Sequence, residues 1–466
     1  MHRVVRRRFV AGPDEGSSLI EVIVAMFIFA LISVGVVHTM TSVLSVSRDS
    51  RSRQVALNLA AQEIDRSRES SDDLFALLTE DLDDVVLNGD TFHIHRETQW
   101  VSDPGLDLEC GSGGGTLRYK RVNVTITWDN MRSSTDAVRA DTIIDPQERI
   151  NDPTKGTILV SVLNSQGSGS SGVTVGATVG SPANGATALA TAPSPTDSEG
   201  CSYILKVVPG NYDVTVSRSG YVDDRHAATA STTVSVIANQ STTVQFQYDR
   251  AATVTASYAT TSPVPGTRIP ANVATTYLGG VDPYVAQPTI DTTVTTRTLP
   301  MHPIASGYQA FAGTCVAADP EAWPDGTDLA SQPISGVREP AFTTVPGGTA
   351  ATNVPMGVVT VTLGGSAGGR QLRATSTTGQ AATEDPGCGA TPVVYSFGNT
   401  AATRLPGSGT MTVALPFGSW YLESYNGSSW VRVTQAQLTL VTTTGRSETA
   451  GGANGVVTFD PRVVAP

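Results

Sequence analysis

The sequence predicts an α+β arrangement, with a long N-terminal helix that carries a small antiparallel sheet, followed by all-β sandwich domains. Residues 19–37 form one apolar run, interrupted only by Glu21, Ser33 and Gly35. Residues 38–68 contain neither Pro nor Gly, so a helix that begins in the apolar run can continue through them. Beyond about residue 90, apolar and polar residues alternate in short runs separated by turn-forming residues, which is the pattern of β-strands.

Length and composition limit the possible functions. The chain has 466 residues, enough for about three domains, and its 39% hydrophobic residues are ample for packed cores. Its formal net charge is -12. This acid excess argues against a polyanion partner. Nucleic-acid binding in particular uses clustered Lys and Arg, so a nucleic-acid partner is not expected.

The apolar run is long enough to cross a membrane. A helix of about 20 residues spans roughly 30 Å of hydrocarbon, and we place the transmembrane segment at about residues 18–38. Basic residues stand before the run at Arg3, Arg6, Arg7 and Arg8, and after it at Arg48, Arg51 and Arg53. The first group favours a cytoplasmic N-terminus and the second weakens that bias. We expect a single pass through the cytoplasmic membrane, with the C-terminal part outside.

Glu21 is unusual because it is a carboxylate inside the apolar run. A charge there costs about 3 kcal/mol unless a cation compensates it, and a new amino terminus made by proteolysis a few residues upstream would be such a cation. An ordinary secretory signal peptide has a shorter apolar stretch, of about 7–15 residues. A plain signal anchor with a stray Glu is the alternative.

The residues Gly16-Ser17-Ser18-Leu19-Ile20-Glu21, after a short basic leader, resemble the class III signal of type IV prepilins and pseudopilins. The resemblance implies a leader of residues 1–16, cleavage after Gly16 by a membrane-embedded prepilin peptidase, and N-methylation of Ser17 by the same enzyme. It also implies that Glu21 pairs with the amino terminus of a neighbouring subunit during filament assembly. The family's usual first mature residue is Phe or Met, and Ser17 departs from that pattern.

The predicted helix covers residues 17–70, with Leu57, Ala60, Ala61 and Ile64 at helical spacing to face a sheet. Two helices joined near Arg48 are the alternative. Residues 71–150 then form a small antiparallel sheet, with strands at 92–97, 122–128 and 138–144. The run RYKRVNVTITWDN followed by TIID is similar to minor pilins of the PilV type, so the resemblance makes this domain a pilin head.

Two groups in the head have metal-binding residue types, and we predict a metal site at neither. His93 and His95 lie on one side of a strand without a third ligand nearby in the sequence. We therefore predict that they are solvent-facing strand residues, and metal ligands are the alternative. The acids of this region do not have the spacing of an EF-hand loop. We therefore predict a solvated acidic segment, and calcium ligands are the alternative. These acids are Asp72, Asp73, Glu80, Asp81, Asp83, Asp84 and Asp90.

Residues 156–250 read as a β-sandwich after a turn-rich linker. A phrase T-D-x-x-G followed by V-x-P-G-x-Y-x-V-x-V resembles Cna-B and carboxypeptidase-regulatory-like modules, which act as spacers or binding platforms. The phrase comprises Thr196, Asp197, Gly200, Val207, Pro209, Gly210, Tyr212, Val214 and Val216. Tyr212 is expected in the core. Some Cna-B domains carry a Lys–Asn isopeptide bond, for which Lys155 and Asn239 have the right order.

Nucleotide-binding and catalytic motifs are excluded by their context. Gly167, Gly169 and Gly172 match G-x-G-x-x-G, but the run that follows them is strand-like where a dinucleotide site needs a helix, so they form a sandwich loop. Neither a P-loop nor an H-E-x-x-H sequence is found. The protein is predicted to be no enzyme and to need no cofactor.

Residues 251–466 form the last β-rich block, with longer loops expected between residues 260 and 350. The phrase Leu415-Pro416-Phe417-Gly418 with Trp420 echoes the one at Pro209 and suggests a divergent second copy. Aromatic residues gather in the predicted hairpin that follows, where they serve either sugar stacking or packing. These are Trp420, Tyr421, Tyr425 and Trp430.

The four cysteines lie in the part expected outside the membrane, where an even number suggests disulfides. Cys315 with Cys388 is the preferred pair because both belong to the last block. Cys110 and Cys201 then either pair across two domains or stay free.

These features together predict a minor pilin of a type IV pilus that displays a β-rich ectodomain at the cell surface. The alternative is a pseudopilin of a type II secretion or DNA-uptake system. Its expected partners are other pilin subunits, the prepilin peptidase/methyltransferase and the membrane. If the last two blocks act as an adhesin, a ligand on another surface is a further expected partner.

Overall fold

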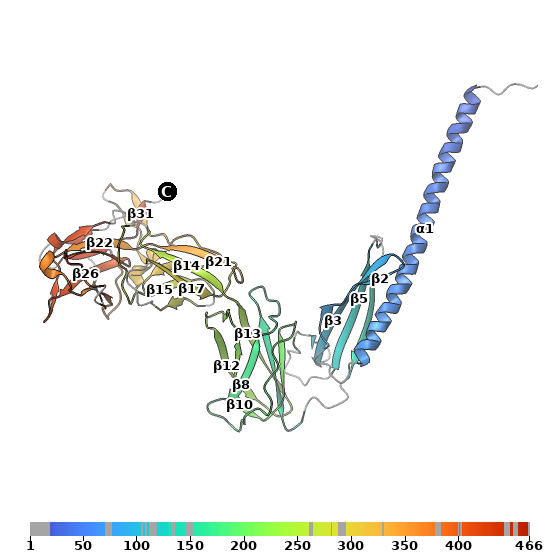
Figure 1. Cartoon of the computed structure of the whole chain (residues 1–466), viewed down its shortest axis with the longest axis horizontal. Helices are drawn as coiled ribbons and strands as arrows, with labels where there is room; N and C mark the ends of the chain where they lie inside the picture. Colours follow the sequence, from blue (N-terminus) through green and yellow to red (C-terminus); the bar gives the residue numbers. More distant parts are fainter. Residues whose placement is uncertain are drawn as a thin grey trace, which may run out of the picture. The chain divides into compact units, whose positions relative to one another are not determined.

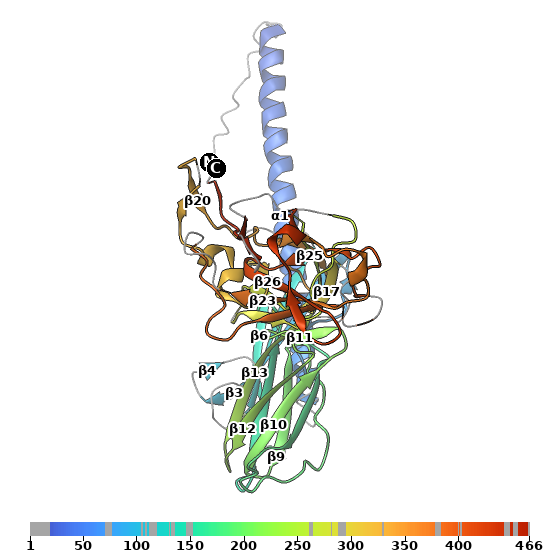
Figure 2. The same ribbon diagram turned by 90° about the vertical axis from the view of Figure 1, so that its left-hand side faces the viewer.

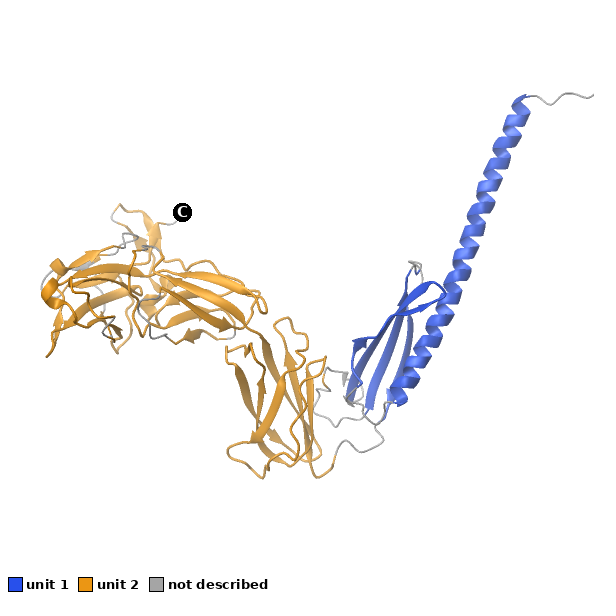
Figure 3. Cartoon of the chain, viewed as in Figure 1, with its two compact units in different colours: residues 1–107, 118–149 blue, residues 108–117, 150–466 orange. Residues whose placement is uncertain are grey.

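The computed structural model describes residues 19–69, 77–103, 106–107, 110, 119–129, 131, 136–145, 152–260, 264–280, 282–287, 295–328, 330–377, 384–398, 400, 403–441, 448–450 and 455–464. The chain divides into two compact units (Figure 3). Residues 1–107 and 118–149 form the first unit, and residues 108–117 and 150–466 form the second. The predicted division between a head that ends at residue 150 and a sandwich that begins at residue 156 is therefore close to the observed one, except that residues 108–117 belong to the second unit.

The first unit contains one continuous helix, α1 (Leu19–Glu69), of 51 residues (Figure 1). At 1.5 Å per residue its length is about 76 Å. The alternative of two helices joined near Arg48 is therefore wrong. Residues 17, 18 and 70 of the predicted helix lie outside the described residues.

The head is an antiparallel sheet in the order β1-β3-β5-β6, with β2 and β4 also paired to β3. Its strands are β1 (Glu80–Asp81), β2 (Val85–Leu87), β3 (Asp90–Asp103), β4 (Leu106–Asp107), β5 (Tyr119–Trp128) and β6 (Val138–Ile144). Along β5 every second side chain is buried, including Val122, Val124 and Ile126, and these face the helix side of the sheet. The three predicted strands are confirmed, and the predicted α+β head is present.

The helix face that meets the sheet differs from the predicted one. Ala56, Ala60 and Ile64 are buried, whereas Leu57 is half exposed and Ala61 is exposed. The predicted face was therefore wrong at two of its four positions. Small side chains allow the helix backbone to lie close to the pleated sheet, and a Leu in the same row would hold the two apart.

The second unit begins with a sandwich of two sheets, ordered β12-β10-β8 and β11-β13-β7-β9. Figure 2 shows β10 beside β12. The strands are β7 (Gly156–Leu163), β8 (Thr174–Val179), β9 (Cys201–Val207), β10 (Gly210–Ser217), β11 (Tyr221–Asp223), β12 (Thr229–Val236) and β13 (Ser241–Arg250). Their inward residues form one core that includes Ile158, Tyr212 and Val214. The predicted sandwich and the burial of Tyr212 are confirmed.

The glycine motif of this domain has the structure that the sequence suggested. The glycine-rich stretch at residues 167–172 lies between strands β7 and β8, so the loop interpretation of G-x-G-x-x-G is confirmed. Asn239 donates its backbone N–H to the carbonyl of Lys155 at 2.8 Å. An isopeptide bond between their side chains stays a prediction.

The last block contains several sheets, in the orders β17-β14-β21, β16-β15-β18, β19-β20-β31, β25-β22-β28 and β24-β23-β26-β30-β29 with β27 on β26. Its strands up to residue 354 are β14 (Ala252–Tyr258), β15 (Thr275–Leu278), β16 (Tyr284–Ala286), β17 (Thr296–Met301), β18 (Gln309–Ala312), β19 (Gly326–Thr327), β20 (Pro333–Ser335) and β21 (Thr349–Val354). The others are β22 (Gly357–Thr362), β23 (Leu372–Thr377), β24 (Val394–Phe397), β25 (Thr410–Leu415), β26 (Gly418–Tyr425), β27 (Trp430–Arg432), β28 (Leu438–Leu440), β29 (Glu448–Ala450), β30 (Val456–Phe459) and β31 (Val463–Val464). Residues 260–350, expected to be rich in loops, contribute strands β15 to β20 and part of β21.

The suspected repeat is supported by two matching turns. Gly210 and Gly418 each begin a strand with positive φ, +146° and +120°. Two residues later an aromatic side chain is buried and donates a hydrogen bond to the carbonyl four residues before it. Tyr212 Oη lies 2.9 Å from the Val208 oxygen, and Trp420 Nε1 lies 2.9 Å from the Pro416 oxygen. The two sequence phrases therefore build the same local structure.

Candidate assembly site and exposed surfaces

The first half of α1 stands clear of the head. Glu21 lies in the first turn and is exposed, and the large apolar residues from Leu19 to Val46 are mostly half or more exposed. This is the one helix of the described chain that is long and apolar enough to span a membrane. Gly16 and Ser17, the predicted processing residues, lie outside the described residues. The structure thus exposes a long apolar surface with a single carboxylate near its start.

The second half of α1 is held to the sheet by buried polar groups. Glu63 is buried, and its carboxylate accepts a hydrogen bond from Arg96 Nη1 at 2.8 Å. Asp90 is also buried and pairs with Arg48, while Ser52 Oγ donates to its Oδ2 at 2.7 Å. These hydrogen bonds, from Ser52 first and then Arg48, lower the pKa of Asp90. The solvated interpretation is therefore wrong for Asp90, whose charge is used to dock the helix.

The histidines of the head have acidic neighbours that the sequence did not reveal. His93 and His95 are exposed on the outer face of β3, as expected. His93 Nδ1 lies 2.8 Å from Asp84 and its Nε2 lies 3.4 Å from Asp129, while His95 Nδ1 lies 2.7 Å from Asp81. Hydrogen bonds to Asp84 and Asp129 raise the pKa of His93. Each histidine is therefore hydrogen-bonded to at least one neighbouring carboxylate.

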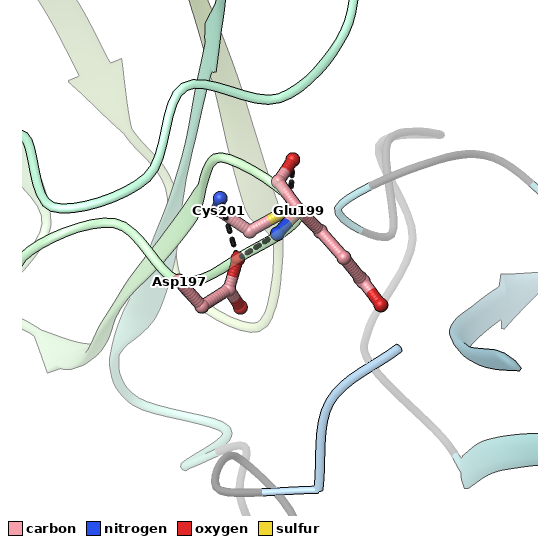
Figure 4. A group of neighbouring side chains, drawn as sticks. All are labelled: Asp197, Glu199 and Cys201. Carbon is pink, nitrogen blue, oxygen red and sulfur yellow. Dashed lines mark hydrogen bonds between the residues drawn. The ribbon is translucent and has the colours of Figure 1, made fainter. Parts of the chain in front are cut away.

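Three potential metal ligands meet in the sandwich, at Asp197, Glu199 and Cys201 (Figure 4). Asp197 Oδ1 accepts the backbone N–H groups of Glu199, at 3.0 Å, and Cys201, at 2.9 Å, so it closes the turn of the T-D-x-x-G motif. Gly200 has φ +77°, and a Cβ there would lie 2.3 Å from the Val162 oxygen. Cys201 is in a disulfide and has no thiolate to offer. The group therefore serves the turn.

Two disulfides join the four cysteines. Cys315 bonds to Cys388 within the last block. Cys110 bonds to Cys201, which places residues 108–117 with the second unit although they are inserted between strands β4 and β5 of the head. Thus the predicted domain range 71–150 is interrupted at residues 108–117, which belong to the second unit.

A histidine pair lies where the sandwich meets the last block. The backbone N–H of His302 donates to His226 Nδ1 at 2.9 Å, and the His226 ring lies 4.1 Å from the ring of Tyr284 and 5.7 Å from that of Tyr308. Burial, with a smaller contribution from His302, lowers the pKa of His226 to about 4. His226 is therefore neutral near pH 7 and accepts a hydrogen bond through Nδ1.

Acidification should weaken this junction. Between pH 6.5 and about 4 the unfolded chain binds a proton at His226 that the folded chain does not, so stability falls as the pH is lowered through that range. We expect faster hydrogen exchange in residues 296–312 of the detergent-solubilised chain at about pH 5 than at about pH 7, after correction for intrinsic exchange. His226→Asn should reduce this pH dependence, and His38→Asn on α1 should preserve it. An unchanged dependence in His226→Asn would contradict the assignment.

Comparisons with known proteins give no family. No protein-family model matches the chain, and no curated protein matches it. Among solved structures, the chain is similar to the Bacillus anthracis TIE protein at 12% identity and a TM-score of 0.19, over 74% of this chain and 65% of that one.

Two pilin structures also match at a similar level. A Streptococcal ancillary pilin matches at 9% identity and a TM-score of 0.18, over 56% of this chain and 92% of that one. The D312A form of BcpA, the major pilin subunit of Bacillus cereus, matches at 9% identity and a TM-score of 0.15, over 66% and 95% of the two chains. Similarity this low does not assign a family to the chain.

Proposed function

We propose that the chain is a minor pilin of a type IV pilus, a structural protein with no catalytic role. In this proposal prepilin peptidase removes residues 1–16, methylates Ser17, and leaves α1 in the cytoplasmic membrane until the subunit is extracted into a filament. The carrying observation is Glu21, which stands five residues after Gly16 in the exposed apolar half of α1. The two β-rich blocks are then displayed at the cell surface.

The arrangement of α1 supports assembly through its apolar half. The part that contacts the head begins near Arg48, so the preceding residues remain available to neighbouring subunits. In the membrane these residues contact lipid, and in a filament they would contact the same residues of other pilins. Lipid and packed helices are both apolar, so the apolar residues of α1 have a similar free energy in the two states. The states then differ mainly in Glu21, which would be unpaired in the membrane and paired in the filament.

The N-terminus of the mature protein tests the proposal. In cells that contain prepilin peptidase, mass spectrometry of the membrane-extracted chain should find Ser17, methylated, as the first residue. Gly16→Val should block cleavage because the peptidase reads that position, whereas Gly12→Val in the same leader should leave it intact. A chain that kept residues 1–16 in such cells would refute the proposal.

Immunogold labelling of sheared filaments separates a pilus subunit from a secretion pseudopilin. Label at tips or along shafts is expected. The ectodomain of residues 156–466 favours display, because it is much larger than the head that a pseudopilin needs. Processing at Gly16 without label on any surface filament would favour the pseudopilin.

A further inference from the structure

Six side chains share one face of the sheet that contains β23, β26 and β27. Strand β26 alternates, so Trp420 and Leu422 are buried in the core while Tyr421 and Tyr425 lie on the opposite face and are partly exposed. Strands β23 and β27 flank β26 and add side chains to this face. The six residues are Arg373, Tyr421, Glu423, Tyr425, Trp430 and Arg432, and we call them the arginine–aromatic face.

The strand register arranges these residues in rows. Glu423 is paired with Arg373 on one side and with Arg432 on the other, so a charged row crosses three strands. In the row on one side of this charged row, Tyr425 is paired with Trp430, and the centres of their rings lie 5.4 Å apart. Tyr421 lies in the row on the other side. Aromatic rings thus flank a central charged row.

The two arginines lie over the rings on either side. The Arg373 guanidinium carbon is 4.2 Å from the centre of the Trp430 ring, and that of Arg432 is 3.8 Å from the centre of the Tyr421 ring. These contacts restrict the long side chains, so less conformational entropy is lost when a ligand binds.

The two arginines differ in whether their guanidinium groups are paired with a carboxylate of the protein. Glu423 is 8% exposed and accepts a hydrogen bond from Arg373 Nε at 2.7 Å. Arg432 is exposed and makes no ion pair with a carboxylate in the part of the chain that the structure describes. Its planar guanidinium therefore presents donors to solvent in the geometry that binds a carboxylate.

We propose that the arginine–aromatic face binds an acidic polysaccharide. This proposal rests on the surface display proposed above and specifies the class of ligand that the displayed part would bind. Arg432 would pair with a sugar carboxylate, and the partly exposed Trp430 and Tyr425 rings would stack on the apolar C–H face of a neighbouring sugar. A neutral glycan would leave the Arg432 charge without a partner. The net charge of -12 opposes polyanions in general, nucleic acid included, so the attraction for an acidic polysaccharide comes from Arg432 and the rings of this face alone.

Binding of the full chain in detergent to immobilised alginate, a polyuronate, tests the proposal, with dextran as the neutral comparison. We expect binding to alginate that weakens as salt is added, and little binding to dextran. Arg432→Gln and Trp430→Ala should each weaken binding by about tenfold. Arg218→Gln is the matched control, since Arg218 lies 4.5 Å from the Tyr221 ring centre in the sandwich and should leave binding unchanged.

Three results would overturn the proposal. These are equal binding to dextran and alginate, undiminished binding by both variants, and binding of polyglutamate as tight as that of alginate, which would indicate an acidic peptide site. Circular dichroism of each variant separates lost binding from lost folding. Processing at Gly16 does not depend on this face, so failure here would leave the pilin proposal standing.

Discussion

Glu21→Ala is expected to reduce incorporation into filaments by about a hundredfold or more while leaving membrane insertion intact. An unpaired carboxylate in the apolar part of a membrane costs about 3 kcal/mol, which corresponds to a factor of more than about a hundred in an equilibrium. If pairing with the amino terminus of a neighbouring subunit removes that cost, the carboxylate favours the filament. Replacing it with Ala removes the cost of the unpaired carboxylate in the membrane. The free-energy difference that favours the filament is then lost.

The measurement is the amount of the chain in sheared filaments relative to the amount in membranes, by immunoblot. Glu69→Ala is the matched control because it removes the same charge from the exposed end of the same helix. Processing at Gly16 should be normal in both variants. Equal amounts of Glu21→Ala and wild-type chain in filaments would contradict the role given to this carboxylate.

Asp460→Ala is expected to destabilise the last block by about 3–5 kcal/mol, because it leaves a buried charge without its main partner. The side chains of Arg462 and Asp460 are 0% and 1% exposed, and Arg462 Nη2 lies 2.8 Å from Asp460 Oδ2. Arg462 Nη1 also donates to the Pro324 carbonyl and to Glu384, both at 2.7 Å. These contacts connect the chain's last described residues to segments far away in the sequence.

Urea unfolding of the detergent-solubilised chain, followed by hydrogen exchange in β30 and β31, measures this loss. The control is Asp65→Ala, which breaks an exposed ion pair with Arg68 whose side chains are 73% and 60% exposed. Exposed pairs contribute at most about 1 kcal/mol, so this variant should unfold near the wild-type midpoint. Equal midpoints for the two variants would show that burial does not determine the strength of the Asp460 pair.

Patterns that depend on neighbours in the sequence predicted most of the fold. The length of α1, the alternation in β3 and β5, and the turn at Pro209 follow from local periodicity and turn chemistry. The docking face of α1 did not follow, because apolar spacing pointed to Leu57 while close packing selected small residues and the buried Glu63. Asp90 was mistaken for a solvated acid because its partners lie 38 and 42 residues away.

The candidate sites divide in the same way. Glu21 stays a prediction, and the sequence singles it out because its motif is contiguous and the helix around it is uniformly apolar. The aromatic residues near 420–430 were found, but only the strand register separates Trp420, buried in the core, from Trp430 on the outer face. Arg373 was missed because it comes from a strand more than 50 residues before Trp430, and nothing in its own surroundings marks it.

The disulfide between Cys110 and Cys201 has a mechanical consequence when the chain is pulled from its C-terminal part. Residues 108–117 leave the head after β4 and return at β5, so the chain passes between the units three times, near residues 107, 118 and 150. The linker and the disulfide close a covalent ring that contains strands β5 to β8. Tension applied beyond Cys201 is therefore shared between the linker after β6 and both ends of the tethered segment. Under reducing conditions only the linker would carry it.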